Sequence, residues 1–215
     1  MSMQKKYQTG FTLVEIAIVL VIIGLLLGGV LKGQELIYNQ KVKSTYDSYR
    51  QYTAAMYGYQ DRYRAIPGDD ANVLTRGFVA TGGVAIVAGN GNGFISGGGN
   101  TCLTAAAGPG TEVCQANYHL RLSGFLTGQG TVSATHPFGG VVVLNAPTVI
   151  LAPNALTGPT AICWNALPNK AAQQIDLAYD DGVATTGSMR GTADYTTLMV
   201  TLPDTASALW SCMTN

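Results

Sequence analysis

Charged residues are scarce in this 215-residue chain, where Asp, Glu, Lys and Arg make up only 11% of the composition. Twelve bases balance twelve acids, so the sequence does not indicate a strongly basic surface, and nucleic-acid binding is not expected. With so little charge, much of the surface must be uncharged and polar or buried against other subunits. Self-association explains this composition most simply.

Residues suited to catalysis are also few. The chain has two histidines, His119 and His136, and neither has a partner constellation in the sequence that would make it a catalytic base. We therefore interpret both as structural histidines and expect no enzymatic activity. A membrane-anchored enzyme would need a convergent polar site in the globular part, and the sequence does not indicate one.

The longest apolar run covers residues 11–31, and Glu15 is its only charge. At 1.5 Å per residue this run is about 30 Å long, the thickness of the hydrocarbon core of a bilayer. A carboxylate in such a helix costs about 2.5 to 3.5 kcal/mol near the bilayer centre. It is tolerable when it is paired, so Glu15 needs a cationic partner.

A short polar leader, residues 1–10, precedes the run and holds Lys5 and Lys6 but no acid. This charge pattern places the N-terminus in the cytoplasm and everything after the run on the other side of the membrane. Two simpler interpretations remain. A secretory signal peptide would have a shorter apolar core and an A-x-A-type cleavage site. A plain single-span anchor would account for the length but not for Glu15.

The stretch Gly10-Phe11-Thr12-Leu13-Val14-Glu15, after a short basic leader, resembles the processing site of type IV pilins and of the related type II secretion pseudopilins. The resemblance implies that a prepilin peptidase cuts after Gly10 and methylates the new amine of Phe11. It also implies that Glu15 pairs with the N-terminal amine of a neighbouring subunit during filament assembly. Cleavage would supply the countercharge that Glu15 requires.

Residues 34–64 are more polar but keep a helical period. Tyrosine and apolar side chains recur at spacings of three and four, which predicts one helix face packed on a globular head. This stripe comprises Tyr38, Val42, Tyr46, Tyr49, Tyr52, Met56, Tyr59 and Tyr63. We expect one helix from Phe11 to Arg64, ended by Ile66-Pro67-Gly68. The predicted parts are a prepilin leader (1–10), a transmembrane and assembly helix (11–33), an amphipathic helix (34–64) and a periplasmic head (65–215).

The head begins with a glycine-heavy region up to Gly110. Its Pro67-Gly68-Asp69 stretch and its loop 89–93, Gly-Asn-Gly-Asn-Gly, resemble segments of a subset of pilin-like heads. Asparagine stands where that subset has aspartate in the loop, which weakens a calcium site there, and we expect turns.

β-branched and apolar runs at 140–145, 148–151, 160–164 and 195–201 predict about four antiparallel strands. Short helices are predicted at 112–123 and 169–179. The fold class is α+β, a long helix packed on an antiparallel sheet, as in pilins.

Cys102, Cys114, Cys163 and Cys212 fit no zinc spacing, and an even number of cysteines in an exported domain favours disulfides. Three pairings are possible. We favour Cys102 with Cys114 and Cys163 with Cys212, because the resemblance implies a C-terminal disulfide loop like that of pilins.

Asp176, Asp180 and Asp181 form a carboxylate cluster near the end of the second short helix. Some pseudopilin heads hold calcium near their C-termini, which makes these three residues calcium candidates. Paired acids before a glycine are also a common turn, and that is the interpretation we favour, with no cofactor.

Together these features predict a subunit of a type IV pilus or pilus-like filament. Its expected partners are the prepilin peptidase, other pilin subunits and an inner-membrane assembly platform. We expect it in the inner membrane, with the head in the periplasm, and then in a filament at the cell surface. A type II secretion pseudopilin, and a minor pilin acting in adhesion or DNA uptake, remain alternatives. The four cysteines and the long glycine-rich insert favour a pilus subunit.

Overall fold

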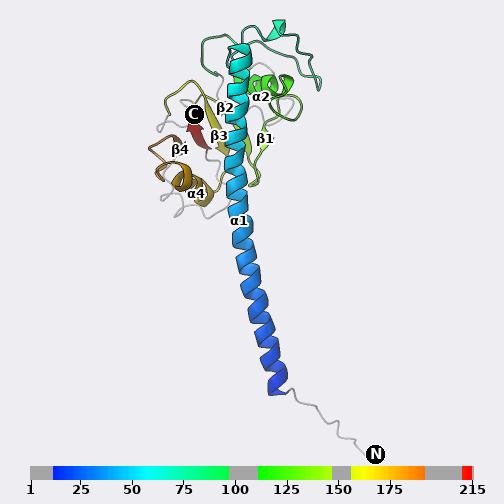
Figure 1. Cartoon of the computed structure of the whole chain (residues 1–215), viewed down its shortest axis with the longest axis vertical. Coiled ribbons are helices and arrows are strands. Elements are labelled where there is room, and N and C mark those ends of the chain that lie inside the picture. The colour runs from blue at the N-terminus through cyan, green and yellow to red at the C-terminus, as the bar shows by residue number, and fades with distance from the viewer. Residues whose placement is uncertain (1–11, 97–110, 147–155, 192–209, 215) are drawn as a thin grey trace, which may run out of the picture. The chain divides into compact units, whose positions relative to one another are not determined.

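The computed structural model describes residues 12–96, 111–146, 156–191 and 210–214 (Figure 1). Its contacts divide the chain into two units, Met1–Gln40 and Lys41–Asn215, which we describe separately. Two of the predicted strands, 148–151 and 195–201, lie outside the described residues, as do Gly10, Phe11 and Cys102.

Helix α1 spans Leu13–Tyr63 and contains 51 residues. It starts later than predicted because Thr12 is not helical, and its hydroxyl accepts a hydrogen bond from the Glu15 amide (3.3 Å). It ends one residue early because Arg64 has a left-handed backbone (φ 53°) and its amide donates to the Gln60 carbonyl (2.8 Å). This arrangement is a left-handed helix C-cap, so the turn before Pro67 begins inside the predicted helix.

The second unit has its core where the last turns of α1 meet a sheet. Tyr52, Met56 and Tyr59, three members of the predicted tyrosine stripe, are buried there. The polar tips of this helix face are bonded to the sheet: the Trp164 indole N–H donates to the Ser48 hydroxyl (3.1 Å), and the Tyr49 hydroxyl donates to the Thr214 carbonyl (3.0 Å). The stripe prediction is thus confirmed at the end of α1, where its apolar bodies are buried and its hydroxyls find acceptors.

The sheet has five antiparallel strands in the order β1-β2-β3-β5-β4. The strands are β1 (Ala134–Thr135), β2 (Val141–Asn145), β3 (Ala161–Asn165), β4 (Met189–Gly191) and β5 (Trp210–Thr214). The predicted strands at 140–145 and 160–164 correspond to β2 and β3. Strands β1, β4 and β5 have no counterpart among the strands predicted from the sequence.

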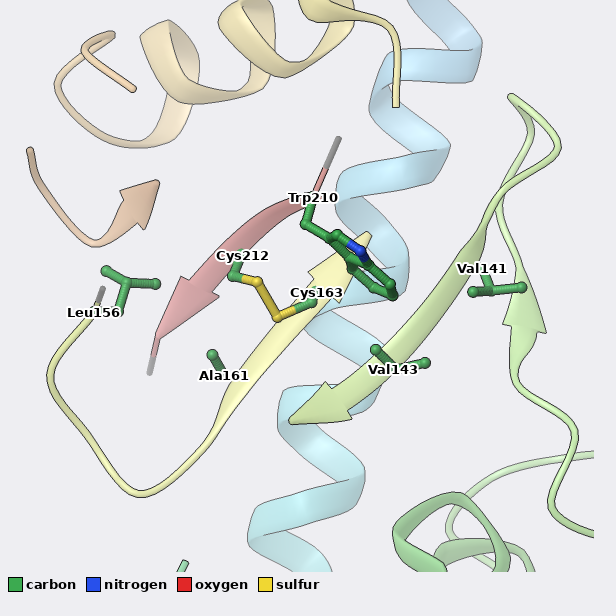
Figure 2. Packing of buried hydrophobic residues seen from close by; sticks show 7 residues of the cluster. All are labelled: Val141, Val143, Leu156, Ala161, Cys163, Trp210 and Cys212. Atoms are coloured by element: carbon green, nitrogen blue, oxygen red, sulfur yellow. A yellow bond between two sulfur atoms is a disulfide. The ribbon is translucent and has the colours of Figure 1, made fainter. Parts of the chain in front are cut away.

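Both faces of the central strands are buried. Side chains that alternate along β2 and β3 point to opposite faces of the sheet, and those on both faces are less than 5% exposed. One set is Val142, Leu144 and Trp164, and the second set is Val143 and Cys163. Figure 2 shows the second set with Trp210 and Cys212 on one face of the sheet, with α1 behind the strands. The sequence predicted a sheet packed on the helical stripe, and the structure adds a buried apolar layer on the other face of these strands.

Two further helices complete the described part of the head. Helix α2 spans Glu112–Leu122 and packs against β2, and helix α4 spans Asn169–Tyr179, as predicted. A short 3-10 helix, η1 (Val73–Thr75), follows the Pro-Gly-Asp turn after α1. The head is therefore the predicted α+β arrangement of a long helix packed with an antiparallel sheet.

Candidate functional site

The first turn of α1 is organised by Thr12 and Glu15. The Glu15 carboxylate accepts hydrogen bonds from the Thr12 amide and from the Thr12 hydroxyl, both at 2.8 Å and both on Oε2. With the reciprocal bond from the Glu15 amide, these contacts make a capping box, the Thr-x-x-Glu pattern that satisfies the free amides at a helix start. The apolar surroundings of Glu15 predict an intermolecular partner but do not indicate this second role within its own helix.

Among the described residues, donors reach only one of the two carboxylate oxygens of Glu15. Both bonds from Thr12 go to Oε2, and no described residue donates to Oε1. The side chain lies on an exposed stretch of helix. The carboxylate can therefore keep its capping bonds and still accept a donor from another chain.

The apolar part of α1 leaves its side chains exposed in the single chain. Leu13 is 91% exposed, and every large apolar side chain from Leu13 to Leu31 is at least 45% exposed. The helix contains an 18-residue window with a mean hydropathy of 2.8, of which none is buried, so it is long and apolar enough to cross a membrane. Cβ atoms added at Gly24, Gly28, Gly29 or Gly33 would meet nothing, so these glycines leave the helix surface open to close neighbours.

At the other end of α1, Asp70 is buried and fully bonded. It accepts the Tyr59 hydroxyl (2.7 Å) and the Asn72 amide (3.0 Å) and forms a two-pronged ion pair with Arg76. Burial alone would raise the pKa of the Asp70 carboxyl, but the bonds from Arg76, Tyr59 and Asn72 outweigh burial and hold that pKa below its ordinary value. This network fixes the turn that follows α1.

Two more buried acids hold the glycine-rich loop. Asp69 accepts the amides of Gly91 (2.6 Å), Asn92 (3.1 Å) and Gly93 (2.7 Å). Glu112, at the start of α2, accepts the Asn90 amide (2.9 Å). It also accepts the amide of Ser96 (2.7 Å). The loop is therefore built from backbone amides folded around carboxylates, which agrees with the predicted turn role.

His119 is buried in α2 and makes two hydrogen bonds to the backbone. Its Nδ1 accepts a hydrogen bond from the Gly68 amide (3.0 Å), and its Nε2 lies 3.2 Å from the Val87 carbonyl oxygen. Both hydrogen bonds can form at once only when the ring is neutral and carries its proton on Nε2. Burial lowers the pKa of this imidazole to about 4. The other histidine, His136, is also buried, with Nε2 2.8 Å from the Asn165 carbonyl. Both geometries fit the structural role expected for these residues.

The three predicted calcium candidates do lie together, with one oxygen of each within 4.8 Å of the others. The same carboxylates also bind the loop after α4. Asp176 accepts the Gly182 amide (3.1 Å), Asp180 accepts the Met189 amide (2.7 Å), and Asp181 accepts the Val183 amide (2.8 Å) and the Thr186 hydroxyl (2.6 Å). Each acid therefore has a structural use as a turn residue.

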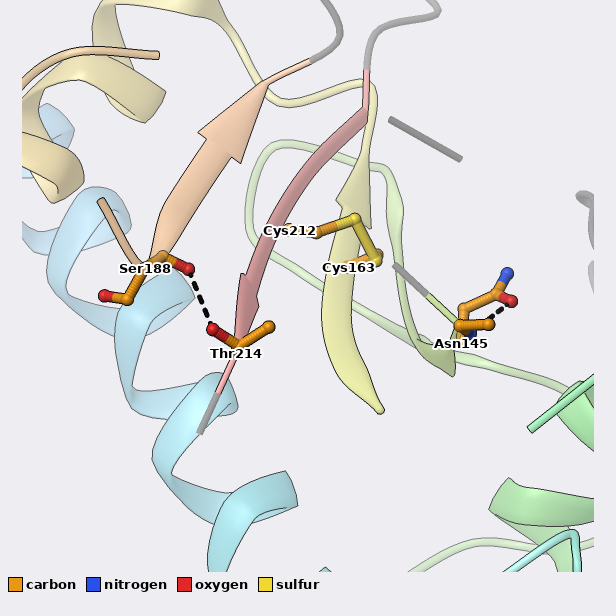
Figure 3. Close-up of a disulfide and its surroundings, with 6 residues drawn as sticks. Asn145, Cys163, Ser188, Cys212 and Thr214 are labelled. Carbon is orange, nitrogen blue, oxygen red and sulfur yellow. Dashed lines mark hydrogen bonds between the residues drawn. A yellow bond between two sulfur atoms is a disulfide. The ribbon is translucent and has the colours of Figure 1, made fainter. Parts of the chain in front are cut away.

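A disulfide joins Cys163 in β3 to Cys212 in β5, with 4.0 Å between the Cα atoms (Figure 3). The two residues are directly opposite each other in the sheet register. One of the two predicted pairs is thus present, and it ties the C-terminal strand to the centre of the sheet. Cys114 is also disulfide-bonded, and its predicted partner Cys102 lies outside the described residues.

A cleft of about 530 Å³ lies beside the end of α1, lined by Tyr63, Arg64 and Arg76 among others. The two acids in its wall, Asp69 and Asp70, have donors on both oxygens within the head, as described above. In the described part of the head these two carboxylates therefore hold the chain around the cleft in place.

These observations define the class of the protein: an exposed apolar helix begins at a motif containing one acid, and its far end packs with an antiparallel sheet in a pilin-like α+β head. Residues 5–31 match a family model described as the prokaryotic N-terminal methylation motif, which is the signature of type IV pilins and pseudopilins. No curated protein and no solved structure is significantly similar to the chain. The chain thus carries the N-terminal signature of type IV pilins and pseudopilins at the start of a long helix that packs with an antiparallel sheet.

Proposed function

We propose that this protein is a structural subunit of a type IV pilus or pilus-like filament and has no catalytic activity. The observation that carries the proposal is the exposed apolar helix with Glu15 in its first turn. An isolated subunit leaves that helix and one carboxylate oxygen without protein partners among the described residues, whereas a bundle of the same helices would cover both.

In this proposal the chain is made with its leader in the cytoplasm and its head in the periplasm. The prepilin peptidase cuts between Gly10 and Phe11 and methylates the new amine. The mature helix then leaves the inner membrane through an assembly platform and packs beside other pilin subunits. The amine of one copy approaches the free Oε1 of Glu15 in the next, while Oε2 keeps the helix capped.

The head is suited to the outside of a cell. The disulfides at Cys163–Cys212 and at Cys114 need an oxidising compartment, which supports export of this domain. They also support a pilus subunit over a secretion pseudopilin, because pseudopilins often lack paired cysteines. Adhesion and DNA uptake are finer roles, and no contact in the described head favours one over the other.

Mass spectrometry of the mature N-terminus tests the proposal. In cells that contain a prepilin peptidase we expect a chain that begins at methylated Phe11 and is recovered in filaments sheared from the cell surface. A protein that still begins at Met1 in such cells, or that stays in the membrane fraction after processing, would overturn the proposal.

A further inference from the structure

The loop that Asp69 holds contains two Asn-Gly pairs, Asn90-Gly91 and Asn92-Gly93. Asn-Gly is the dipeptide most open to spontaneous loss of ammonia, because glycine has no side chain to hinder the reaction. The glycine nitrogen attacks the asparagine Cγ, a C–N bond forms, the bond to the side-chain nitrogen breaks, and ammonia leaves. Water then opens the five-membered ring to aspartate or isoaspartate. Both asparagines are exposed, so water has access to the loop.

In this structure both attacking nitrogens are engaged with the same buried acid. The Gly91 amide donates to Asp69 Oδ1 at 2.6 Å, and the Gly93 amide donates to Asp69 Oδ2 at 2.7 Å. The Asp69 side chain is buried, with 4% of the residue exposed. One carboxylate thus holds the reactive N–H of both pairs.

The two side chains that would be attacked are held as well. Asn90 Oδ1 accepts the Asn92 amide (2.9 Å), and Asn92 Oδ1 accepts the Phe94 amide (2.9 Å). These are two consecutive turns in which an asparagine side chain caps the backbone two residues on. Each Cγ must leave that hydrogen bond before it can turn toward the nitrogen of the next residue.

The charge of Asp69 determines the direction of its effect. Attack requires the glycine nitrogen to lose its proton, and a carboxylate less than 3 Å away disfavours the resulting amide anion. A carboxylate is also far too weak a base to take that proton itself, so Asp69 opposes the reaction rather than promoting it.

We propose that Asn90 and Asn92 are latent sites of spontaneous modification and that Asp69 keeps them intact in the folded head. The first modification removes the protection of the second site. An isoaspartate adds one carbon to the backbone, which shifts the loop amides that donate to Asp69. Aspartate and isoaspartate both also add a negative charge close to Asp69 and Glu112. The loop, with its exposed Phe94, is then released from the head.

The test follows the asparagines in the full-length chain, purified in detergent and incubated at mildly alkaline pH. Peptide mapping by mass spectrometry measures the exchange of –NH2 for –OH at each position, and an isoaspartate methyltransferase counts the rearranged product. Wild type in urea provides the unprotected reference rate. Asp69→Asn removes the charge, and Glu112→Gln is the matched control, because Glu112 binds the same loop but neither glycine amide.

We expect both sites in folded wild type to react at least about tenfold more slowly than in urea, since opening must break charge-assisted hydrogen bonds. Asp69→Asn should react faster than folded wild type and recover part of the urea rate, because it removes the charge but keeps both asparagine turns and the bond from the Gly91 amide to the main-chain carbonyl of residue 69 (3.0 Å). Glu112→Gln should stay slow. Equal rates in folded and unfolded wild type, a slower reaction in Asp69→Asn, or equal acceleration by both variants would each overturn the role of Asp69. The comparison of folded and unfolded wild type needs no variant. It therefore still tests whether the folded head protects both asparagines if Asp69→Asn fails to fold.

Discussion

Glu15 caps helix α1 and is the proposed assembly contact, and a single substitution can separate these two roles. Glutamine at position 15 keeps an oxygen that can accept the Thr12 amide and hydroxyl, and Gln is the usual alternative to Glu in this motif. It cannot form an ion pair with an amine. Glu15→Gln therefore preserves the start of the helix and removes the charge, whereas Glu15→Ala removes both.

The expected magnitudes differ enough to measure. Loss of a helix cap costs about 0.5 to 2 kcal/mol, while removal of one partner from a buried ion pair costs about 3 to 5 kcal/mol. At 1.4 kcal/mol per factor of ten, Glu15→Gln should weaken incorporation into filaments by about a hundredfold or more. Thr12→Ala, the matched control, removes the capping hydroxyl and keeps the carboxylate, so it should weaken incorporation by about thirtyfold or less.

The assay compares wild type with the three variants in cells that process the leader. Immunoblots of the sheared filament fraction measure incorporation, and mass spectrometry of the membrane fraction confirms cleavage at Gly10. Circular dichroism of the detergent-solubilised chains reports the helix. If Glu15→Gln assembles like wild type while Thr12→Ala and Glu15→Ala both fail, Glu15 acts through the helix cap and the intermolecular ion pair is refuted.

Four further predictions concern processing and the head. Gly10→Val should leave a longer precursor in the membrane, visible by mass spectrometry, and normal cleavage would contradict the assigned junction. The folded pKa of His119, about 4, lies below its ordinary value of 6.5, so its contribution to stability is complete above pH 6.5 and declines as the pH falls toward 4. The free energy of unfolding should therefore drop by about 2 kcal/mol between pH 7 and pH 5, and an equal drop in His119→Gln would exclude this residue as the cause. Replacing Cys163 and Cys212 together by alanine should cost about 4 kcal/mol or less in denaturant unfolding, because their bond closes a loop with a sequence separation of 49; an unchanged midpoint would contradict this. Calcium should leave the melting temperature unchanged, since Asp176, Asp180 and Asp181 already bind the loop after α4; a rise that Asp180→Asn abolishes would instead establish a calcium site.

The parts of the fold that could be predicted are those in which neighbouring residues carry the information. The tyrosine stripe follows a helical period, and helix α4 has the predicted bounds Asn169–Tyr179 because Pro168 suits a helix entry. The capping box was equally local, since Thr12 and Glu15 stand at the required spacing. The apolar surroundings of Glu15 predict only a partner in another chain, so the capping box was not among the predictions.

The parts that could not be predicted depend on contacts between distant segments. Strands β1 and β4 have two and three residues, too few for a sequence period, and their pairing comes from the neighbouring strands. Strand β5 reads Trp-Ser-Cys-Met-Thr, with little β-branched character, and lies in the sheet beside the disulfide-bonded β3. Likewise, Asp69 accepts hydrogen bonds from backbone amides more than 20 residues away. The repeated glycines of that loop predicted turns but not this carboxylate partner.

Three buried acids of the head contrast with Glu15. Asp69, Asp70 and Glu112 each have donors on both carboxylate oxygens, which offsets the cost of removing these charges from water. Glu15 lies in the most apolar segment of the chain, yet its described donors reach only Oε2. In lipid or in a helix bundle an open carboxylate oxygen is costly, and the chain's own described residues do not cover it. In the proposed filament a donor from a neighbouring copy covers this oxygen, and the proposed cleavage at Gly10 creates an amine of the required charge.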